Sequence, residues 1–369
     1  MKVMTVFGTR PEGVKMAPVI KALEKREGVE QVICITAQHR EMLDQVIDLF
    51  GIKPDYDLNI FKPGQSLTDI TTNALKGLED VIKKEKPDVL LVQGDTTTVF
   101  AGALAAFYQK VRIGHVEAGL RSGNLYSPYP EEANRKLTGV MADFHFAPTE
   151  KNRENLLKED YSDEKIFITG NTVIDALKYA VKDDYEFEDE RLNRIDFQNK
   201  RVILMTSHRR ENLGEPMENI FTAVRDAIEG FDDVHVVFPV HLNPKVREIA
   251  DRILGNNPKV SLTEPLDYAP FTNLMARVAL VVTDSGGLQE EAPALGKPVL
   301  VIREETERPE GVEAGTAKLV GTSYLGVYNN LLKLLQDEEE YHRMAKAVNP
   351  YGDGTASEKI VDVLQKMVR

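Results

Sequence analysis

The stretch Val89-Leu90-Leu91-Val92-Gln93-Gly94-Asp95-Thr96-Thr97-Thr98 decides the fold, because it joins a short apolar run directly to helix-capping residues. A run rich in valine and leucine that ends at a glycine predicts a strand buried on both faces. Aspartate and threonine side chains bond the N–H groups of a helix's first turn. The stretch therefore predicts a strand, a turn and a helix, the unit from which parallel α/β sheets are built.

The same alternation of apolar run and helical pattern repeats along the chain, which predicts parallel sheets covered by helices on both faces. In the first half we expect strands at Val3–Phe7, Gln31–Thr36, Val89–Gln93, Val111–Val116, Phe144–Ala147 and Ile166–Thr169. In the second half we expect them at Val202–Thr206, His235–Pro239, Val260–Leu262, Leu280–Thr283 and Pro298–Ile302. The acidic segment Lys182–Lys200 predicts a linker, and a last helix is expected near Ser357–Val368.

Length and composition set limits on function. A chain of 369 residues suits two α/β domains, and 42% hydrophobic with 28% charged residues is typical of a soluble globular protein. The net charge of −13 argues against a nucleic-acid partner, because a phosphate backbone needs a basic face. We expect no signal peptide at Met1–Phe7 and no membrane span. The one cysteine, Cys34, lies in an apolar run and predicts a core thiol, so the chain suits a reducing cytoplasm.

Ligands of doubly wound sheets bind at the carboxyl ends of the strands, so the loops that follow strands are the candidates for function. The first is Gly8-Thr9-Arg10-Pro11-Glu12-Gly13-Val14-Lys15. It lacks the Lys-Ser/Thr of a P-loop and the G-x-G-x-x-G of a dinucleotide site, which argues against nicotinamide. A Tyr161…Lys165 pair, at the spacing of NAD-dependent sugar epimerases, lacks the accompanying glycines. Arg10 and Lys15 remain as anion ligands near a helix N-terminus, with two solvated basic residues as the alternative.

Three acidic residues follow strands or begin a helix in the first half. Asp95 is either a helix N-cap or a carboxylate at the mouth of a cleft, and the residues alone do not separate the two. Glu117 follows His115, but a zinc deaminase signature is impossible with one cysteine, so a polar pocket is favoured. Glu131 stands four residues before Arg135, and a surface ion pair is the simple alternative to a functional role.

In the second half, one strand runs into Ser207-His208-Arg209-Arg210-Glu211-Asn212, and a histidine beside two arginines predicts an anion site. Another opens into Asp284-Ser285-Gly286-Gly287-Leu288-Gln289-Glu290-Glu291, where bare backbone N–H groups can approach a phosphate. Glu290 or Glu291 can then accept hydrogen bonds from ribose hydroxyls. The charged loop Arg303–Gly311 is either a cleft rim or a solvated loop.

Together these motifs resemble the non-hydrolysing UDP-N-acetylglucosamine 2-epimerases of bacteria, through essentially the whole chain. The matching segments are FGTRPE with KMAP, TAQHREMLDQV, GDTTT, GHVEAGLRS, SPYPEEANR, HFAPT, TGNTVIDAL, HRREN, PVHLNP, TDSGGLQEEAP, GKPVLV, ERPEG and NPYGDG. The resemblance implies an α/β fold of two Rossmann-like, doubly wound parallel-sheet domains facing a cleft, the B-type glycosyltransferase fold. It also implies that the last helix crosses back, giving domains at 1–170 plus 355–369 (catalytic) and 171–354 (UDP-binding).

The resemblance implies the roles of individual residues. The catalytic positions are Asp95, Glu117, Glu131 and His208. The positions that hold UDP are Arg10, His208, Ser285, Gly286 and Glu291, with Phe271 near the base. In addition to these, we expect Lys15, Arg135, Arg209 and Gly287 to bind substrate. A second, activating UDP-N-acetylglucosamine is implied at Gln38, His39 and around Gln65, where Glu41 and Gly64 depart from some relatives, and we expect Arg210 to contribute there.

The implied reaction is reversible C2 epimerisation of UDP-N-acetylglucosamine to UDP-N-acetylmannosamine by elimination and re-addition of UDP through 2-acetamidoglucal. The resemblance implies no cofactor and no metal. It implies a homodimer, and a product that would supply surface polysaccharide synthesis. The alternatives are a UDP-dependent glycosyltransferase, a hydrolysing epimerase, a sugar-nucleotide sensor, and an epimerase of a related diacetamido sugar nucleotide.

Overall fold

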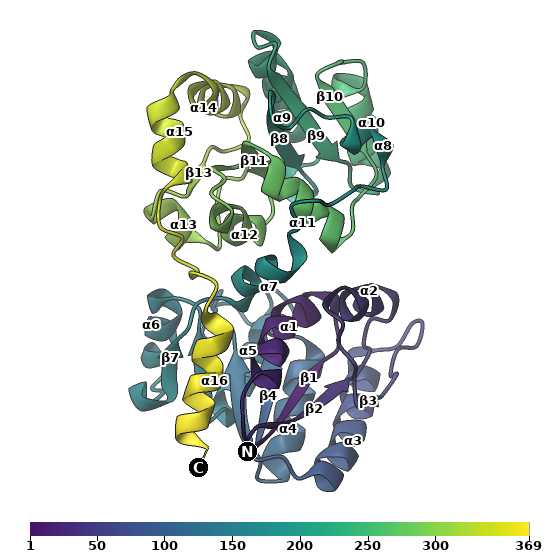
Figure 1. Ribbon diagram of the computed structural model, residues 1–369, viewed down its shortest axis with the longest axis vertical. Helices are drawn as coiled ribbons and strands as arrows, with labels where there is room; N and C mark the ends of the chain where they lie inside the picture. Colours follow the sequence, from purple (N-terminus) through teal and green to yellow (C-terminus); the bar gives the residue numbers. More distant parts are fainter. Residues whose placement is uncertain (369) are drawn as a thin grey trace. The chain divides into compact units, whose positions relative to one another are not determined.

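The computed structural model describes residues 1–368, which form two compact units. The first joins Met1–Tyr179 to the chain from Tyr351 onward, and the second is Ala180–Pro350 (Figure 1). Both boundaries differ from the predicted 170/171 and 354/355. The backbone N–H of Asn171 donates to the carbonyl of Tyr351 at 2.7 Å, which keeps the start of α7 (Thr172–Ala180) and the returning chain in the first unit.

Within residues 1–368, the first unit has a seven-stranded sheet in the order β3-β2-β1-β4-β5-β6-β7, and all its pairs are parallel. The strands are β1 (Lys2–Phe7), β2 (Glu30–Ile35), β3 (Tyr56–Asp57), β4 (Val89–Gln93), β5 (Arg112–Val116), β6 (Phe144–Ala147) and β7 (Ile166–Ile168). Each predicted strand is present to within one residue at either end. Only β3 was missed, because its two residues carry no apolar run.

Helices connect the strands of the first unit. They are α1 (Arg10–Glu24), α2 (Glu41–Phe50), α3 (Leu67–Glu85), α4 (Thr97–Tyr108), α5 (Glu131–Met141), α6 (Glu150–Lys158) and α7, with a 3₁₀ turn at Asp163–Lys165. Cys34 is fully buried in the core between the sheet and these helices, as predicted.

The last helix, α16 (Ala356–Met367), belongs to the first unit, which confirms the predicted crossing back. It packs against α1 (Figure 1), and Arg26 forms an ion pair with Asp362 at 2.5 Å. The buried carboxylate of Asp175, from α7, accepts hydrogen bonds from the backbone N–H groups of Ala356 and Ser357. A residue far away in sequence therefore caps the start of α16.

The second unit has a six-stranded sheet, counted over the described residues, in the order β10-β9-β8-β11-β12-β13, again all parallel. Its strands are β8 (Arg201–Thr206), β9 (Val234–Pro239), β10 (Val260–Thr263), β11 (Leu280–Thr283), β12 (Val299–Val301) and β13 (Ala317–Leu319). Its helices are α8 (Glu190–Asn193), α9 (Glu215–Glu229), α10 (Pro244–Leu254), α11 (Tyr268–Arg277), α12 (Leu288–Ala294), α13 (Pro309–Glu313), α14 (Tyr324–Gln336) and α15 (Glu338–Ala345), with a 3₁₀ turn at Arg210–Asn212. The short edge strand β13 was not predicted.

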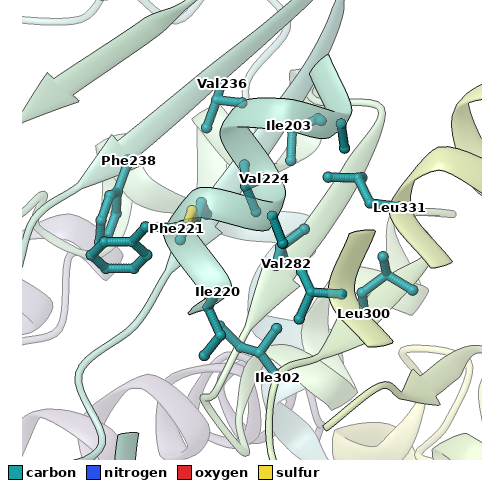
Figure 2. Packing of buried hydrophobic residues seen from close by; sticks show 14 of the residues in the cluster. Ile203, Ile220, Phe221, Val224, Val236, Phe238, Val282, Leu300, Ile302 and Leu331 are labelled. Carbon is teal, nitrogen blue, oxygen red and sulfur yellow. The ribbon is translucent and has the colours of Figure 1, made fainter. Parts of the chain in front are cut away.

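The core of the second unit lies between its sheet and α9, where Phe221 meets Phe238 edge to face at 5.3 Å (Figure 2). The segment predicted as a linker, Lys182–Lys200, is part of this unit. It contains α8, and Phe187 is buried with its ring near that of Phe197. Burial of an aromatic anchor orders this segment despite its acidic composition. Over residues 1–368, no helix has the length and apolar character to cross a membrane.

Candidate active site

Glu117 lies directly after β5, and its carboxylate is buried. Lys15 Nζ, from α1, lies 2.7 Å from both of its oxygens. Gln93 Nε2 donates to Oε2, and Asn171 Nδ2 donates to Oε1 at 3.0 Å. Glu117 has a φ of 65°, in the left-handed region that residues other than glycine rarely adopt. A buried carboxylate on a strained backbone, with donors on both oxygens, is typical of a functional position.

The two basic residues of the first loop have different surroundings. Lys15 is paired with Glu117 and its side chain is 22% exposed, so the alternative of a solvated lysine is wrong. Arg10 is the first residue of α1 and is half-buried. An anion is favoured at such a helix N-terminus, so the role of Arg10 as an anion ligand stays a prediction.

Asp95 is joined to α5 by two side chains. Arg135 donates from Nε and Nη2 to Asp95 Oδ2 at 2.9 and 2.6 Å, and Asn134 Nδ2 donates to the Asp95 carbonyl at 2.9 Å. The N-cap of α4 is Thr96, whose hydroxyl accepts from the backbone N–H of Val99. The interpretation of Asp95 as an N-cap is therefore wrong.

The alternative of a surface ion pair between Glu131 and Arg135 is also wrong, since Arg135 pairs with Glu132 Oε2 at 3.0 Å and with Asp95. Glu132 is fully buried and accepts from the backbone N–H groups of Ser122 and Gly123. It holds the loop before α5 in place. Glu131, the first residue of α5, is half-buried at the same end of the helix and remains the candidate for chemistry.

Glu12 is a buried carboxyl that the sequence did not single out. It accepts from the hydroxyl of Thr9 at 2.7 Å, from the backbone N–H of Gly8 at 3.3 Å and from the hydroxyl of Thr96 at 3.0 Å. It therefore ties the loop after β1 to the loop after β4, beside Asp95. Burial raises the pKa of Glu12 to about 7.

His115 has a structural role. Its ring is buried, Nε2 lies 2.7 Å from the Gly94 carbonyl, and burial lowers its pKa to about 4. Among residues 1–368, no three histidine, cysteine, aspartate or glutamate side chains are grouped so as to hold a metal ion.

In the second unit, His208 is held by the buried carboxylate of Asp284. His208 Nδ1 lies 3.0 Å from Asp284 Oδ1, and Oδ2 accepts from the backbone N–H groups of His208 and Arg209 at 2.8 and 2.9 Å. Burial opposes ionisation of Asp284, but the adjacent His208 ring and the backbone N–H groups of His208 and Arg209 outweigh it and lower the pKa of Asp284. Because Nδ1 faces Asp284, Nε2 is the ring nitrogen available to a ligand. Asp284 could have been recognised as the first residue after β11.

The loop after β11 leaves open space over one glycine. A Cβ added to Gly286 would meet no heavy atom of residues 1–368 within 4 Å, and neither Gly286 nor Gly287 has a positive φ. Neither backbone conformation nor packing explains Gly286, which favours the close approach of a ligand. The backbone N–H of Ser285 donates to the hydroxyl of Thr283 at 2.9 Å and fixes the turn.

The two glutamates of α12 differ. Glu290 is buried in an ion pair with Arg308, and its carbonyl accepts from Asn349 Nδ2 at 2.9 Å. Glu291 is half-buried, one turn from Gly287. The ion pair with Arg308 gives Glu290 a structural role, and the role of Glu291 at the ribose stays a prediction of the resemblance.

The other predicted positions have less defined surroundings. Arg209 and Phe271 are half-buried in the second unit, and Arg210 is exposed. In the first unit, Gln38 Oε1 accepts from the hydroxyl of Thr98 at 2.9 Å, and Gln65 is half-buried. His39 is exposed. The loop Arg303–Gly311 is anchored at Arg303, which pairs with Glu211 and Glu307 and has only 9% of its side chain exposed, whereas Glu304, Glu305 and Glu307 are exposed.

Four of the residues described above, Glu12, Asp95, His208 and Asp284, follow the strands at which the strand order of each sheet reverses. In the first unit the neighbours β1 and β4 mark that point, and Glu12 and Asp95 follow them. In the second unit β8 and β11 mark it, and His208 and Asp284 follow them. Such switch points are where doubly wound sheets bind their ligands.

Known proteins resemble this chain over almost its full length. The family model for UDP-N-acetylglucosamine 2-epimerase matches residues 21–365. The UDP-N-acetylglucosamine 2-epimerase of Bacillus subtilis is 56% identical over 364 residues, covering 99% of this chain and 95% of that protein. That of Escherichia coli K12 is 55% identical over 371 residues, covering 99% and 98%.

A solved structure matches the fold. The crystal structure of the UDP-GlcNAc 2-epimerase of Neisseria meningitidis bound to UDP-GlcNAc is 52% identical, with a TM-score of 0.86 over 99% of this chain and 100% of that one. The predicted fold class, two Rossmann-like domains of the B-type glycosyltransferase kind, is confirmed. The chain belongs to the UDP-N-acetylglucosamine 2-epimerase family, as its sequence motifs predict.

Proposed function

We propose that this chain catalyses the reversible C2 epimerisation of UDP-N-acetylglucosamine to UDP-N-acetylmannosamine, by elimination and re-addition of UDP without hydrolysis. Support comes from the family match and from the names of the relatives. The observation that carries the proposal is the set of acidic side chains at the carboxyl-end edge of the first sheet, with Asp95 fixed by Arg135 and Glu117 by Lys15.

The chemistry requires such a set. The proton on C2 of an N-acetylhexosamine is not acidic in the ground state, because C2 is not next to a carbonyl carbon. As the anomeric C–O bond breaks, positive charge develops at C1 and the C2 proton becomes acidic. Loss of that proton gives UDP and 2-acetamidoglucal. UDP then adds back to C1 while a proton is delivered to the opposite face of C2, so proton-transfer groups must flank the ring.

We assign the proton work to Asp95, Glu117 and Glu131 together. Asp95 and Glu117 follow neighbouring strands of one sheet, and Glu131 begins the helix whose next turn binds Asp95. Arg135 pairs with Asp95 and Lys15 pairs with Glu117, and such different surroundings allow one carboxylate to accept a proton while another donates one.

We assign the leaving diphosphate to the second unit. His208, with Nδ1 held by Asp284, would assist departure of the β-phosphate through Nε2. From this unit, Arg209, Ser285, Gly286 and Gly287 would bind the phosphates, Glu291 the ribose, and Phe271 would lie near the base. The resemblance adds Arg10 of the first unit as a further ligand of UDP. Neutralising a diphosphate in this way stabilises the charge that develops on the leaving group.

One incubation tests the proposal and its rivals. With UDP-N-acetylglucosamine alone, we expect an equilibrium mixture with UDP-N-acetylmannosamine, resolved by ion-pair chromatography. No reaction would favour a glycosyltransferase or a sensor, whereas free N-acetylmannosamine with accumulating UDP would show a hydrolysing epimerase. Supplying 2-acetamidoglucal and UDP should give both sugar nucleotides, and failure to do so would contradict the intermediate. Turnover of the diacetamido analogue but not of UDP-N-acetylglucosamine would identify the related substrate instead.

We propose that a second UDP-N-acetylglucosamine activates the enzyme at Gln38, His39, Gln65 and Arg210. Support comes from Gln65, whose Oε1 is buried without a hydrogen-bond partner among residues 1–368 and could accept from a ligand. Sigmoidal dependence of the rate on substrate, lost in Gln65→Ala, is the expected result. A hyperbolic wild-type curve would contradict activation.

We propose a homodimer. Large apolar side chains are exposed near the ends of α4 and α5, which pack against each other: Phe107 (56%), Tyr108 (60%), Leu137 (48%) and Val140 (76%). Self-association would cover this patch. Light scattering should give twice the chain mass for the wild type and less for Val140→Glu, while a monomeric wild type would contradict the dimer.

We also propose a cytoplasmic location and a role in supplying surface polysaccharide synthesis. The buried cysteine Cys34, which forms no disulfide, supports the cytoplasmic location.

A further inference from the structure

Two neutral amides hold the carboxylate of Glu117 from opposite sides. Gln93 is the last residue of β4 and donates to Oε2, whereas Asn171 follows β7 and donates to Oε1 at 3.0 Å. Both are almost fully buried, at 2% and 3% exposure. Since β5 lies between β4 and the β6–β7 pair, the two donors reach Glu117 from either side of its own strand.

The orientation of the Asn171 amide is fixed by its own contacts. Its Oδ1 accepts from the backbone N–H of Val173 at 3.2 Å, so its Nδ2 must be the group that faces Glu117. An amide locked at its oxygen can present a donor in one direction only. Asn171 is therefore suited to fixing where one oxygen of Glu117 lies.

The main chain of Asn171 is held by the segment that returns from the second unit. Its N–H donates to the carbonyl of Tyr351 at 2.7 Å, and Tyr351 is the first residue of that segment. Next to this bond, Gly170 and Gly352 have φ values of 89° and 127°, and their backbones touch. A Cβ on Gly170 would lie 3.2 Å from both Gly352 Cα and the Tyr351 carbonyl oxygen, so the packing at this crossing requires glycine.

We propose that Asn171 is a positioning residue for the epimerisation: with Gln93 it sets the position of the Glu117 carboxylate, and the returning chain at Tyr351 sets the position of Asn171. The inference rests on the proposed function, in which Glu117 transfers a proton at C2. Neither amide titrates, so the clamp keeps one geometry while the carboxylate gains and loses its proton. Lys15, the charged partner, supplies attraction, but its flexible side chain fixes the direction of the carboxylate less well.

The first test is Asn171→Ala in the full-length enzyme, compared with Gln109→Ala. Gln109 Nε2 donates to Glu79 Oε1 at 3.2 Å, an amide-to-carboxylate bond between α3 and the end of α4, away from the site. We expect Asn171→Ala to lower kcat about 10-fold or more, with KM and the Kd for UDP changed by less than about 2-fold. Gln109→Ala should leave all three unchanged. A wild-type kcat in Asn171→Ala, or an equal loss in Gln109→Ala, would overturn the proposal.

The second test separates positioning from a general loss of stability. Asn171→Asp has the same shape as the wild-type side chain but places a second carboxylate beside Glu117, while Lys15 and the buried His115 are unchanged. Two adjacent carboxylates retain a shared proton to higher pH. We expect the acid limb of the kcat/KM profile to move up by about one pH unit, and an unmoved limb would contradict contact with the working carboxylate.

The third test probes the returning chain. Gly352→Ala changes none of the side chains that donate to Glu117, yet it should lower kcat with little change in KM, because the added methyl displaces the backbone against Gly170. A folded Gly352→Ala with a wild-type kcat would remove the link to Tyr351. Glu117→Gln separates the role of Asn171 from the proposed function. If Glu117→Gln is inactive while Asn171→Ala has normal activity, only the role of Asn171 is contradicted. If the wild-type enzyme shows no epimerisation, the proposed function fails as well.

Discussion

His208 and Asp284, which follow neighbouring strands of the second sheet, are joined by a contact of 3.0 Å between Nδ1 and Oδ1. Asp284 is fully buried, and its other oxygen accepts the backbone N–H groups of His208 and Arg209. One carboxylate thus fixes both the ring and the main chain of the proposed anion site. An imidazole held at Nδ1 presents Nε2 in a defined direction, which is what proton donation to a leaving phosphate requires.

Asp284→Asn should lower turnover because the amide cannot accept every hydrogen bond that the carboxylate accepts. We expect a loss of about 10-fold or more, and roughly 10²-fold or more for His208→Ala. If Asp284 acts through His208, the double variant should be no slower than the slower single variant. Losses that multiply would show that the two residues act independently. Steady-state rates of all three variants, with UDP affinity as the control, decide between these outcomes.

The neighbours Glu131 and Glu132 should give opposite phenotypes. Glu131→Gln is expected to lower turnover roughly 10²-fold with little change in thermal stability, because Glu131 is half-buried and Arg135 is paired elsewhere. Glu132→Gln should cost about 2 kcal/mol or more of stability, because an NH₂ group would then face the N–H donors of Ser122 or Gly123. Thermal denaturation and initial rates measure both. If both variants lost turnover equally and had the same thermal stability, the assignment of a catalytic role to Glu131 and a structural role to Glu132 would be contradicted.

Glu12 should make stability depend on pH between about 4.5 and 7. Its pKa is raised to about 7 by burial, so the folded state retains a proton that the unfolded chain releases near its ordinary value of 4.5. The contribution of Glu12 to the free energy of unfolding is therefore greatest below pH 4.5. It falls by about 3 kcal/mol in total as the pH rises to 7 and above. Glu12→Gln stays neutral throughout, so its melting temperature relative to wild type should rise from pH 5 to pH 8. A difference that is constant with pH would contradict the raised pKa.

His145 should limit stability at acid pH. Its ring is fully buried, neither nitrogen has a hydrogen-bond partner among residues 1–368, and burial lowers its pKa to about 3. The unfolded chain binds a proton at this imidazole near pH 6.5, whereas the folded state does not. The free energy of unfolding therefore decreases as the pH falls from 6.5 towards 3.

His145→Phe should therefore be more stable than wild type, by about 1 kcal/mol at pH 7.5, with the advantage growing towards pH 5. His115, its register partner on β5, is the matched control. His115→Phe should be less stable at pH 7.5, because the hydrogen bond to the Gly94 carbonyl is lost. Denaturant melts across this pH range measure both, and a destabilised His145→Phe would show that the ring nitrogens are satisfied.

Much of the fold could be predicted from local sequence, because buried parallel strands are continuous apolar runs. The exceptions have local causes. The strands β3 and β13 are two and three residues long, too short to give a pattern, and the acidic Lys182–Lys200 is ordered by the buried ring of Phe187.

Local sequence suggests candidate site residues but not their contacts. The residues that follow strands can be named from the sequence alone, whereas the partner of each depends on tertiary structure. The spacing of Glu131 and Arg135 suggested a helical ion pair, whereas Arg135 binds Asp95, 40 residues earlier in the chain. Likewise, Asn171 and Gln93 lie 54 and 24 residues from Glu117, and no local pattern links them to it.

The most direct measurement is the reaction of the wild-type enzyme with UDP-N-acetylglucosamine in heavy water, followed by proton NMR of the hexosamine C2 position. The account predicts that deuterium replaces the C2 proton in both UDP-N-acetylglucosamine and UDP-N-acetylmannosamine, and that Asp95→Asn, Glu117→Gln and Glu131→Gln each slow this exchange. A wild-type enzyme that leaves the C2 proton in place, or three variants that exchange it at the wild-type rate, would contradict the account.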